Sequence, residues 1–276
     1  MTIDAHVHVY TPETIRDWKK IAGREEYFGT LASAKAHKWA TADDVLAAMD
    51  EDGIDESWIC GFGFGDLGRC RETNDYVLEA SERSAGRLRP LCAVPPLARG
   101  AEGEVARCAA RGAIGVGELF PDGRMWCVDD ARETWRLAAA CHENGLFLLV
   151  HAAEPVGRNY AGKGRTGPRE LYLLARNHPE LRILMAHLGG GLFAYESMKD
   201  VGVDLQNVYY DIAALPFLYD ARMLRAAMAL VPGKLLYGSD FPILRYPRYK
   251  AAVEVALSVP EQAALLSANA VRMLAG

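Results

Sequence analysis

The sequence lacks the features that would assign the protein to a membrane, to a secretory route or to a disulfide-stapled fold. No apolar stretch reaches the roughly 18 residues of a membrane span, and no basic segment leading into an apolar one precedes the first predicted strand. The six cysteines, at positions 60, 70, 92, 108, 127 and 141, show no C-x-x-C pair and no regular spacing, so we interpret them as buried thiols. We therefore expect a protein of the reducing cytoplasm.

An excess of basic residues is missing as well. The formal net charge is −5, the isoelectric point lies near 5.8, and no run of five basic residues occurs. Proteins that hold nucleic acid by its phosphates need a local excess of positive charge, so we expect no nucleic-acid partner. The chain also has no G-x-S-x-G elbow, which argues against a serine hydrolase. The expected partner is a small molecule, and a homo-oligomer is left open.

What the sequence does contain is a regular alternation of apolar runs and helical segments. The chain has 276 residues, half of them hydrophobic, which is enough to bury one large core. The predicted strands cover residues 3–9, 57–62, 91–94, 114–119, 146–151, 183–187, 208–212 and 235–238. The predicted helices cover about 41–52, 72–84, 102–110, 130–144, 168–177, the stretch from the glycines at 189–191 to 199, and then 220–229, 247–257 and 260–274.

Apolar strands that alternate with helices predict a parallel sheet buried on both faces. At this length, a single (β/α)8 TIM barrel over residues 1–276 is favoured, with a long loop after the first strand and an extra C-terminal helix. A doubly wound open sheet is the alternative, supported by a G-x-G-x-x-G match from Gly63 to Gly68. The dinucleotide fingerprint belongs in the first strand-to-helix turn, whereas this match follows the second predicted strand. We therefore interpret it as a glycine-rich turn of the barrel.

The long loop after the first strand, residues 10–40, is too aromatic to be a linker, since it contains Trp18, Tyr27, Phe28 and Trp39. Long loops at the carboxyl ends of barrel strands often carry function. We expect this segment to be a partly helical lid or wall over the site.

Two histidines stand two residues apart in the first predicted strand, Ile3-Asp-Ala-His6-Val-His8-Val9. Side chains at this spacing leave a strand on the same face, so both imidazoles can converge on one metal ion. Such a pair alone is weak evidence, because a strand can carry two histidines by chance. Four more candidates stand at the ends of other predicted strands, and in a barrel these ends meet on one face. The predicted metal site therefore consists of His6, His8, Glu118, His151, His187 and Asp240.

The motifs around these residues are Asp-Ala-His6-Val-His8, Val-His151-Ala, Ala-His187-Leu-Gly-Gly and Tyr-Gly-Ser-Asp240-Phe-Pro. Over essentially the whole chain they resemble the amidohydrolase superfamily, and more narrowly its amidohydrolase-2 (amidohydrolase-related) group of TIM-barrel metal-dependent hydrolases. The closing Ser267-Ala-Asn-Ala-Val-Arg-Met-Leu is similar to the terminal helix of that group. The group contains hydrolases of esters, lactones and amides as well as metal-dependent decarboxylases.

The resemblance implies that His6, His8, His151 and Asp240 ligate a divalent ion, with zinc favoured by imidazole-rich ligation and His187 beside the ion. Two-metal relatives often carry a bridging carbamylated lysine on strand four, where this chain has Glu118. A glutamate there resembles the TatD-type hydrolases, in which the carboxylate bridges. One ion is favoured, and a second ion ligated by Glu118 and His187 is left open.

The function that the resemblance implies is hydrolysis of a small, carboxylate-bearing ester, lactone or amide by a metal-activated water. Asp240 would take the proton of that water, and His187 would bond the developing oxyanion or protonate the leaving group. The alternative is a non-oxidative decarboxylase of a small aromatic or unsaturated acid with the same ligands. A third hypothesis is a barrel that binds a ligand or metal without turnover.

Cations near the predicted site suggest an anionic substrate. Arg158 and Arg165 lie in the loop after the fifth strand, and Arg245 follows Asp240. A guanidinium group matches a carboxylate bidentately, so we expect these three arginines to bind the substrate, with solvated surface charges as the alternative. The other histidines are mostly set aside, although His37 lies in the long loop, from which a side chain could reach the site. His142 and His178 are expected on helix surfaces.

Overall fold

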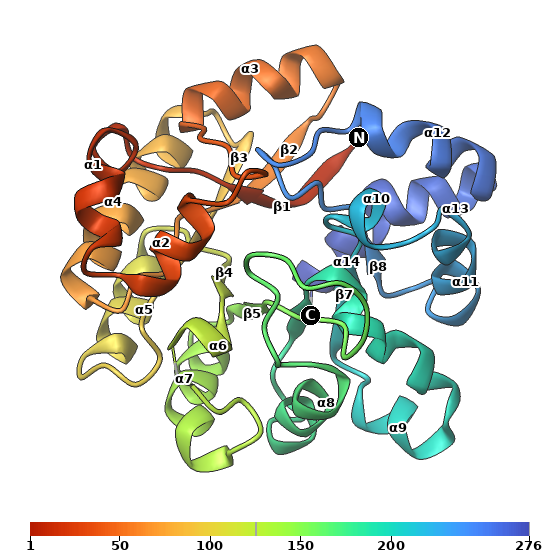
Figure 1. The fold of residues 1–276 in the computed structure, drawn as a ribbon. Coiled ribbons are helices and arrows are strands. Elements are labelled where there is room, and N and C mark those ends of the chain that lie inside the picture. Colours follow the sequence, from red (N-terminus) through yellow and green to blue (C-terminus); the bar gives the residue numbers. More distant parts are fainter. Residues whose placement is uncertain (125, 276) are drawn as a thin grey trace.

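The computed structural model describes residues 1–124 and 126–275, and the strands of this part form a closed parallel barrel (Figure 1). The strands are β1 Ile3–His8, β2 Glu56–Cys60, β3 Leu88–Cys92, β4 Gly115–Leu119, β5 Phe147–Val150, β6 Ile183–Met185, β7 Val208–Asp211 and β8 Leu235–Leu236. They pair in sequence order, each parallel to the next. The ring closes where Ala5 N donates to Tyr237 O at 2.9 Å and His8 N donates to Phe241 O at 2.7 Å. The predicted (β/α)8 barrel is confirmed.

Helices surround the strands on the outside of the barrel (Figure 1). Those of the described residues are α1 Pro12–Ala22, α2 Glu26–Ala32, α3 Ala42–Asp52, α4 Leu67–Arg83, α5 Ala101–Ala110, α6 Pro121–Arg124, α7 Ala131–Glu143, α8 Pro168–Asn177, the 3₁₀ segment η1 His187–Ser197, α9 Lys199–Asp204, α10 Leu215–Leu218, α11 Arg222–Leu230, α12 Pro247–Ala256, α13 Val259–Ala263, the π turn η2 Ala264–Ala268 and α14 Asn269–Ala275. The predicted extra helix at the C-terminus is present as α13, η2 and α14.

The glycine-rich stretch after β2 opens α4 earlier than predicted, at Leu67 rather than at residue 72. Asp66 caps the helix by accepting a hydrogen bond from Arg69 N at 2.8 Å, which explains the earlier start. The backbone amides that would face a phosphate in a dinucleotide site have another partner here. Gly65 N and Asp66 N donate to the carboxylate of Glu25, at 2.9 and 3.2 Å. The structure thus supports a barrel turn at this fingerprint match.

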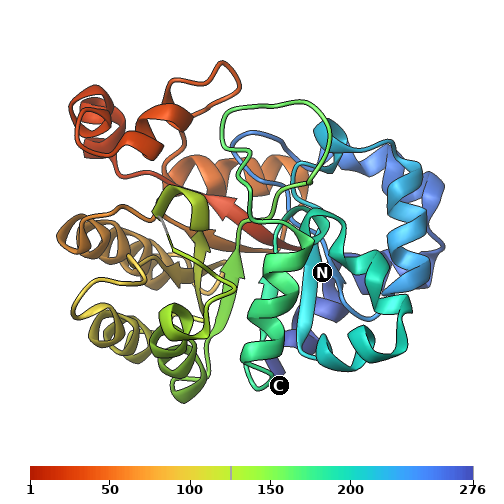
Figure 2. The same ribbon diagram turned by 60° about the horizontal axis from the view of Figure 1, so that its bottom comes forward.

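Two segments rise above the same end of the barrel, the α1–α2 segment and the loop of residues 151–167 between β5 and α8 (Figure 2). They touch where Tyr27 Oη donates to Gly162 O at 3.2 Å. Beneath α2, the buried side chains of Phe28, Phe62 and Phe120 belong to one aromatic cluster that connects this segment to the barrel. The prediction that residues 10–40 are partly helical is confirmed, and the segment lies at the end of the barrel that carries the site.

Two sequence interpretations are wrong. His178, expected on a helix surface, is buried at the end of α8, where its Nε2 lies 2.7 Å from Thr134 Oγ1 of α7. Burial lowers the pKa of this histidine, which therefore pairs with the hydroxyl group as a neutral ring. Cys127 is exposed, whereas the other five cysteines are buried as expected.

Among the described helices, none combines the length and the apolar character that crossing a bilayer requires.

Candidate active site

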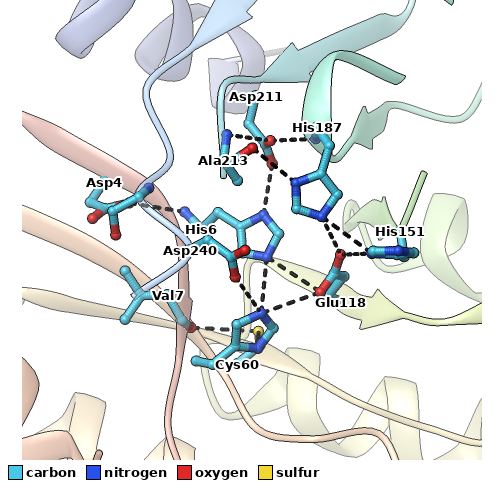
Figure 3. Close-up of polar contacts among 12 residues, drawn as sticks. Asp4, His6, Val7, Cys60, Glu118, His151, His187, Asp211, Ala213 and Asp240 are labelled. Atoms are coloured by element: carbon cyan, nitrogen blue, oxygen red, sulfur yellow. Dashed lines mark hydrogen bonds and ion pairs between the residues drawn. The ribbon is translucent and has the colours of Figure 1, made fainter. Parts of the chain in front are cut away.

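His6 of β1 lies at the centre of the site (Figure 3), and His8 ends the same strand two residues later. The register of β1 against β2 shifts between Asp4 and Val7, and such an irregularity re-aims the side chains around it. Ile3 and Ala5 pack inside the barrel, whereas Val7 packs outward against the helix layer. His6 and His8 point together, with their Nε2 atoms 3.1 Å apart.

The other ring nitrogen of three site histidines is held by a fixed partner. The pairs are His6 Nδ1 with Asp211 Oδ2 at 2.8 Å, His187 Nδ1 with Ala213 O at 2.9 Å, and His8 Nδ1 with Cys60 Sγ at 3.4 Å. Because a carboxylate and a carbonyl oxygen only accept, the Nδ1 atoms of His6 and His187 donate to them. In the neutral rings, the lone pair of Nε2 then faces the centre of the site, as in histidines that ligate metals.

Glu118 spans the site from β4 (Figure 3). Its Oε2 lies 3.4 and 3.2 Å from the Nε2 atoms of His6 and His8. Its Oε1 lies 2.9 Å from His151 Nδ1 and 3.7 Å from His187 Nε2. Each oxygen of this one carboxylate therefore faces a different pair of histidines.

The residue before Glu118 has to be glycine. Gly117 has a φ of +135°, and a Cβ atom there would lie 2.2 Å from the carbonyl oxygen of Leu149 on the neighbouring strand. Only glycine tolerates both the left-handed conformation and this close approach. Gly117 therefore allows the backbone geometry that brings Glu118 into the barrel.

Asp240 and His187 both have left-handed backbones, with φ of 62° and 55°. Non-glycine residues in this region are uncommon and cluster at functional sites. Asp240 N donates to His6 O at 3.0 Å, and this bond places the carboxylate so that Oδ1 lies 3.4 Å from His8 Nε2. The backbone thus holds Asp240 against the histidines of β1.

Burial and mutual attraction act in opposite directions on the charges of the site. Burial lowers the pKa of His6, but Glu118 and Asp211 outweigh it and raise that pKa well above its ordinary value. Burial raises the pKa of Glu118, but His6 and His151 outweigh it and hold that pKa well below its ordinary value. For Asp240 the histidines again outweigh burial, and its pKa is lowered. The carboxylates are therefore ionised, and they lie among ring nitrogens that can bind either a proton or a metal ion.

This donor set fits a divalent cation. Two groups of three ligand atoms each lie within 4.8 Å of one another, and they are His6, His8 and Asp240 on one side and Glu118, His151 and His187 on the other. His151 Nε2 is buried and has no hydrogen-bond partner. Imidazole nitrogens with carboxylate oxygens suit zinc or manganese. The six residues predicted to form the metal site are thus brought together.

A cavity of about 700 Å³ opens directly over these residues. His8, Glu118, His151, His187 and Asp240 contribute to its wall. Much of the remaining wall is apolar or aromatic, and includes Phe62, Phe120, Tyr160, Phe217 and Leu218. The rings of Phe120 and Phe62 are stacked with their centroids 5.6 Å apart, and Phe120 also lies 5.0 Å from the ring of His151. The cavity offers a flat apolar surface next to the candidate metal ligands.

The three arginines predicted to bind substrate are placed differently. Arg158 is among the residues that line the cavity. Arg165 lies outside the lining, with its side chain 98% exposed and 3.6 Å from Asp122. Arg245 also lies outside it and pairs with Asp52 and Glu51 of α3 at 2.7 and 2.8 Å. Substrate binding by all three stays a prediction, and the geometry ranks Arg158 first. His37, which the sequence interpretation mostly set aside, does line the cavity.

Sequence reasoning missed Asp211 and Cys60, which hold the outer nitrogens of His6 and His8. Asp211 is the last residue of β7, and Asp211 Oδ1 also accepts from the backbone N–H of His187 at 2.8 Å. Asp211 stands near the end of the predicted strand 208–212, so the strand-end argument applied to it, whereas Cys60 lies inside the predicted strand 57–62 and gave no such signal. Their role as supports rather than as ligands needed the tertiary structure.

The fold is a parallel (β/α)8 barrel, and its histidines and carboxylates gather at the carboxyl ends of the strands, where barrel enzymes carry their active sites. The protein therefore falls in the class of barrel enzymes with a candidate metal centre. Within that class the chain belongs to the amidohydrolase family, whose model, described as Amidohydrolase, matches residues 3–275. No curated protein matches the sequence.

Solved structures with the same fold include 5-carboxyvanillate decarboxylase from Sphingomonas paucimobilis, 15% identical, with a TM-score of 0.73 over 99% of this chain and 98% of that one. A dihydroxybenzoic acid decarboxylase from Polaromonas sp. JS666, with bound manganese and the inhibitor 2-nitroresorcinol, is 18% identical with a TM-score of 0.71 over 99% and 96%. A probable 2-pyrone-4,6-dicarboxylic acid hydrolase from Acinetobacter baumannii, with bound citric acid, is 14% identical with a TM-score of 0.63 over 100% and 99%. At these identities the likeness shows the fold alone.

Proposed function

We propose that this protein is a divalent-metal-dependent, non-oxidative decarboxylase of a small aromatic acid. The observation that carries the proposal is the aromatic cavity directly over the candidate ligands, with Arg158 in its wall. Two of the proteins with similar structures are named as decarboxylases, of 5-carboxyvanillate and of dihydroxybenzoic acid, which favours this alternative over the hydrolysis first expected.

The cavity suits a flat anionic ring. Phe62 and Phe120 present stacked faces beside His151, and an aromatic substrate gains from such offset or edge contacts. Arg158 supplies a cation that can pair with a carboxylate bidentately. Lys163 also lines the cavity, but its ammonium group donates to Val156 O at 2.6 Å and holds the loop. Arg158 is therefore the better candidate for the substrate carboxylate.

Decarboxylation of such an acid breaks the bond between the ring carbon and the carboxylate. The electron pair stays on the ring carbon, carbon dioxide leaves, and a proton takes its place. A divalent ion held by His6, His8, His151 and Asp240 would stabilise negative charge on the substrate oxygens. His187 lines the cavity with its Nε2 toward the site, so a proton on that nitrogen is positioned for delivery to the ring carbon. Asp240 is ionised and acts as a ligand and as a proton acceptor. Asp211 keeps His6 oriented during this step.

The test is an assay of purified protein reconstituted with Mn²⁺ or Zn²⁺ against a panel of hydroxybenzoic acids, after metal analysis of the protein as isolated. We expect carbon dioxide release with at least one acid, and one solvent deuterium on the ring carbon when the reaction runs in D₂O. The double variant His6→Ala/His8→Ala is the control, and it should lose metal and activity while keeping its circular dichroism spectrum. Release of carbon dioxide by the metal-free double variant at the wild-type rate would contradict the proposal.

Hydrolysis is a second candidate, because Glu118 places one carboxylate oxygen toward each half of the ligand set. A carboxylate in that position suits two ions with a water between them, which is an arrangement that activates water. Lactones and esters in H₂¹⁸O distinguish the two functions. Incorporation of ¹⁸O into the product without release of carbon dioxide would favour hydrolysis.

A further inference from the structure

The cavity contains buried polar atoms that have no partner in the protein. In residues 1–124 and 126–275, four buried side-chain polar atoms lack a hydrogen bond, and three of them belong to residues of the cavity wall. These three are His37 Nε2, His151 Nε2 and Glu154 Oε1. A buried polar atom without a partner is costly, so native proteins usually satisfy such atoms with water or a ligand. His151 belongs to the candidate metal centre, whereas Glu154 lies outside it.

One carboxylate oxygen of Glu154 is held by a tyrosine. Tyr160 Oη donates to Glu154 Oε2 at 3.2 Å. Burial raises the pKa of Tyr160, and the charge of Glu154 raises it further, so this phenol keeps its proton and acts as the donor. Oε1 is the oxygen of Glu154 that remains without a donor.

A carboxylate can only accept hydrogen bonds, so the missing partner of Oε1 is a donor. The substrate's own carboxylate is an acceptor and would be repelled there. An ether or carbonyl oxygen of the substrate is also only an acceptor, so its lone pairs would be repelled by those of Oε1. The chemistry that fits is an O–H or N–H group on another atom of the same molecule.

We propose that Glu154 determines substrate specificity by accepting a hydrogen bond from a hydroxyl or amino group that the substrate carries in addition to its carboxylate. The proposal takes the aromatic acid as substrate from the proposed function. The donor group on that substrate is inferred from Glu154 Oε1, the oxygen that has no partner. Tyr160 acts as a positioning residue, because it holds Oε2 and leaves Oε1 for the ligand. Recognition of the donor group is thereby assigned to one residue of the loop after β5.

The experiment measures binding rather than turnover. Calorimetric dissociation constants are determined on the Mn²⁺-loaded protein for 3- and 4-hydroxybenzoate, the two matching methoxybenzoates, and 3- and 4-aminobenzoate. A hydrogen bond to a charged group predicts that the hydroxyl ligand binds about 10- to 100-fold more tightly than its methoxy counterpart at one ring position at least. The amino ligands show which donor is preferred.

The variant is Glu154→Gln, which keeps the size of the side chain. Its carbonyl oxygen would still accept from Tyr160, which leaves the NH₂ group, a donor, in the place of Oε1. The preference for hydroxyl over methoxy should fall below about threefold or reverse. The matched control is Glu180→Gln, an exposed glutamate outside the cavity lining, which should keep the wild-type preference. Circular dichroism and Mn²⁺ content show whether each variant is folded.

Two results would overturn the proposal. One is a wild-type protein that binds methoxy and hydroxy ligands equally at both positions, which needs no variant at all. The other is a folded Glu154→Gln protein that keeps the full preference. If the preference depends on Glu154 but no acid releases carbon dioxide, the inference about the donor group stands and the decarboxylase function fails. If carbon dioxide is released but the preference does not depend on Glu154, the function stands and the inference about the donor group fails.

Discussion

Glu118 in the barrel and Glu104 in α5 are both almost completely buried, but the groups that surround their carboxylates differ. Their exposed fractions are 2% and 1%. Glu104 is surrounded by donors, since Arg107 binds both of its oxygens at 2.8 Å, and Asn74 Nδ2 and Arg71 Nε donate at 2.8 and 3.2 Å. Glu118 instead faces the Nε2 atoms of His6, His8 and His187, with Asp240 also beside His8.

The pKa does not distinguish the two sites. For Glu104, burial raises the pKa and hydrogen bonds from Arg107 and Asn74 outweigh it, so the pKa is lowered. For Glu118, burial raises the pKa and the histidines outweigh it in the same direction. The difference is that Arg107 is a permanent cation of the chain, whereas an imidazole gives up its proton to a metal ion. Glu104, which is paired with a permanently charged arginine, stabilises the fold. Glu118, which has only histidines around it, is placed to bind a metal ion together with them.

The largest expected effect comes from neutralising the carboxylate of the site. Glu118→Gln should lower activity about 100- to 1,000-fold, because an amide is a poor ligand for a divalent ion and leaves the histidines without a negative partner. If Glu118 bridges two ions, the metal content should also fall from near two per chain toward one. Metal analysis and the carbon dioxide assay check both values.

Glu104→Gln is the matched control for that experiment, and it should leave the metal content unchanged. A metal content that falls equally in both variants would erase the distinction between the two glutamates. A count near one in the wild type and in Glu118→Gln would place Glu118 beside a single ion.

The second effect is on stability and belongs to the other glutamate. Glu104→Gln should lower the free energy of unfolding by about 2 to 3 kcal/mol, below the usual cost of breaking a buried ion pair, because Arg107 is 36% exposed and can reach water. The folded-state pKa of Glu104 is depressed, so its stabilisation is present above its ordinary pKa of 4.5 and is lost as the pH falls through the folded value. Urea unfolding of both proteins should therefore give a difference that shrinks below about pH 4.5. A difference that grows in acid would contradict this role.

The third effect tests the support of the metal ligands. Asp211→Asn removes the charge that holds His6 Nδ1 and should weaken metal binding about 10- to 100-fold, while the fold is retained. The dissociation constant for Mn²⁺ measures it, with the exposed Asp200→Asn of α9 as the control. An unchanged constant would mean that the barrel alone orients His6.

The smallest effect separates the arginines. Arg158→Ala should raise KM about tenfold with little change in kcat, because a contact made equally in the ground and transition states has that signature. Arg245→Ala should leave KM unchanged, since its guanidinium group is engaged by Asp52 and Glu51. Steady-state kinetics over a range of salt concentrations test both. A larger rise in KM for Arg245→Ala than for Arg158→Ala would reverse the ranking.

The sequence by itself determined the barrel and the six residues of the candidate metal site. Apolar strands alternating with helices can bury both faces of a parallel sheet in few ways, so the architecture followed from periodicity. Parallel strands place all their carboxyl ends on one face, so His6, His151 and Asp240 were predictable neighbours despite their separation in the chain. The helix boundaries were less predictable, because caps such as Asp66 act through local hydrogen bonds.

Only the tertiary structure decided what each polar residue contacts. Glu104 and Glu118 are both glutamates of predicted helices or strands, and their roles differ because Arg107 packs against one and histidines from other strands meet the other. The direction of a long side chain depends on partners far away in the chain, and only the tertiary structure shows that Arg245 pairs with α3 and that Arg158 is a residue of the cavity wall. The orphaned oxygen of Glu154 is visible only in the tertiary structure, where Tyr160 holds the other oxygen of the same carboxylate.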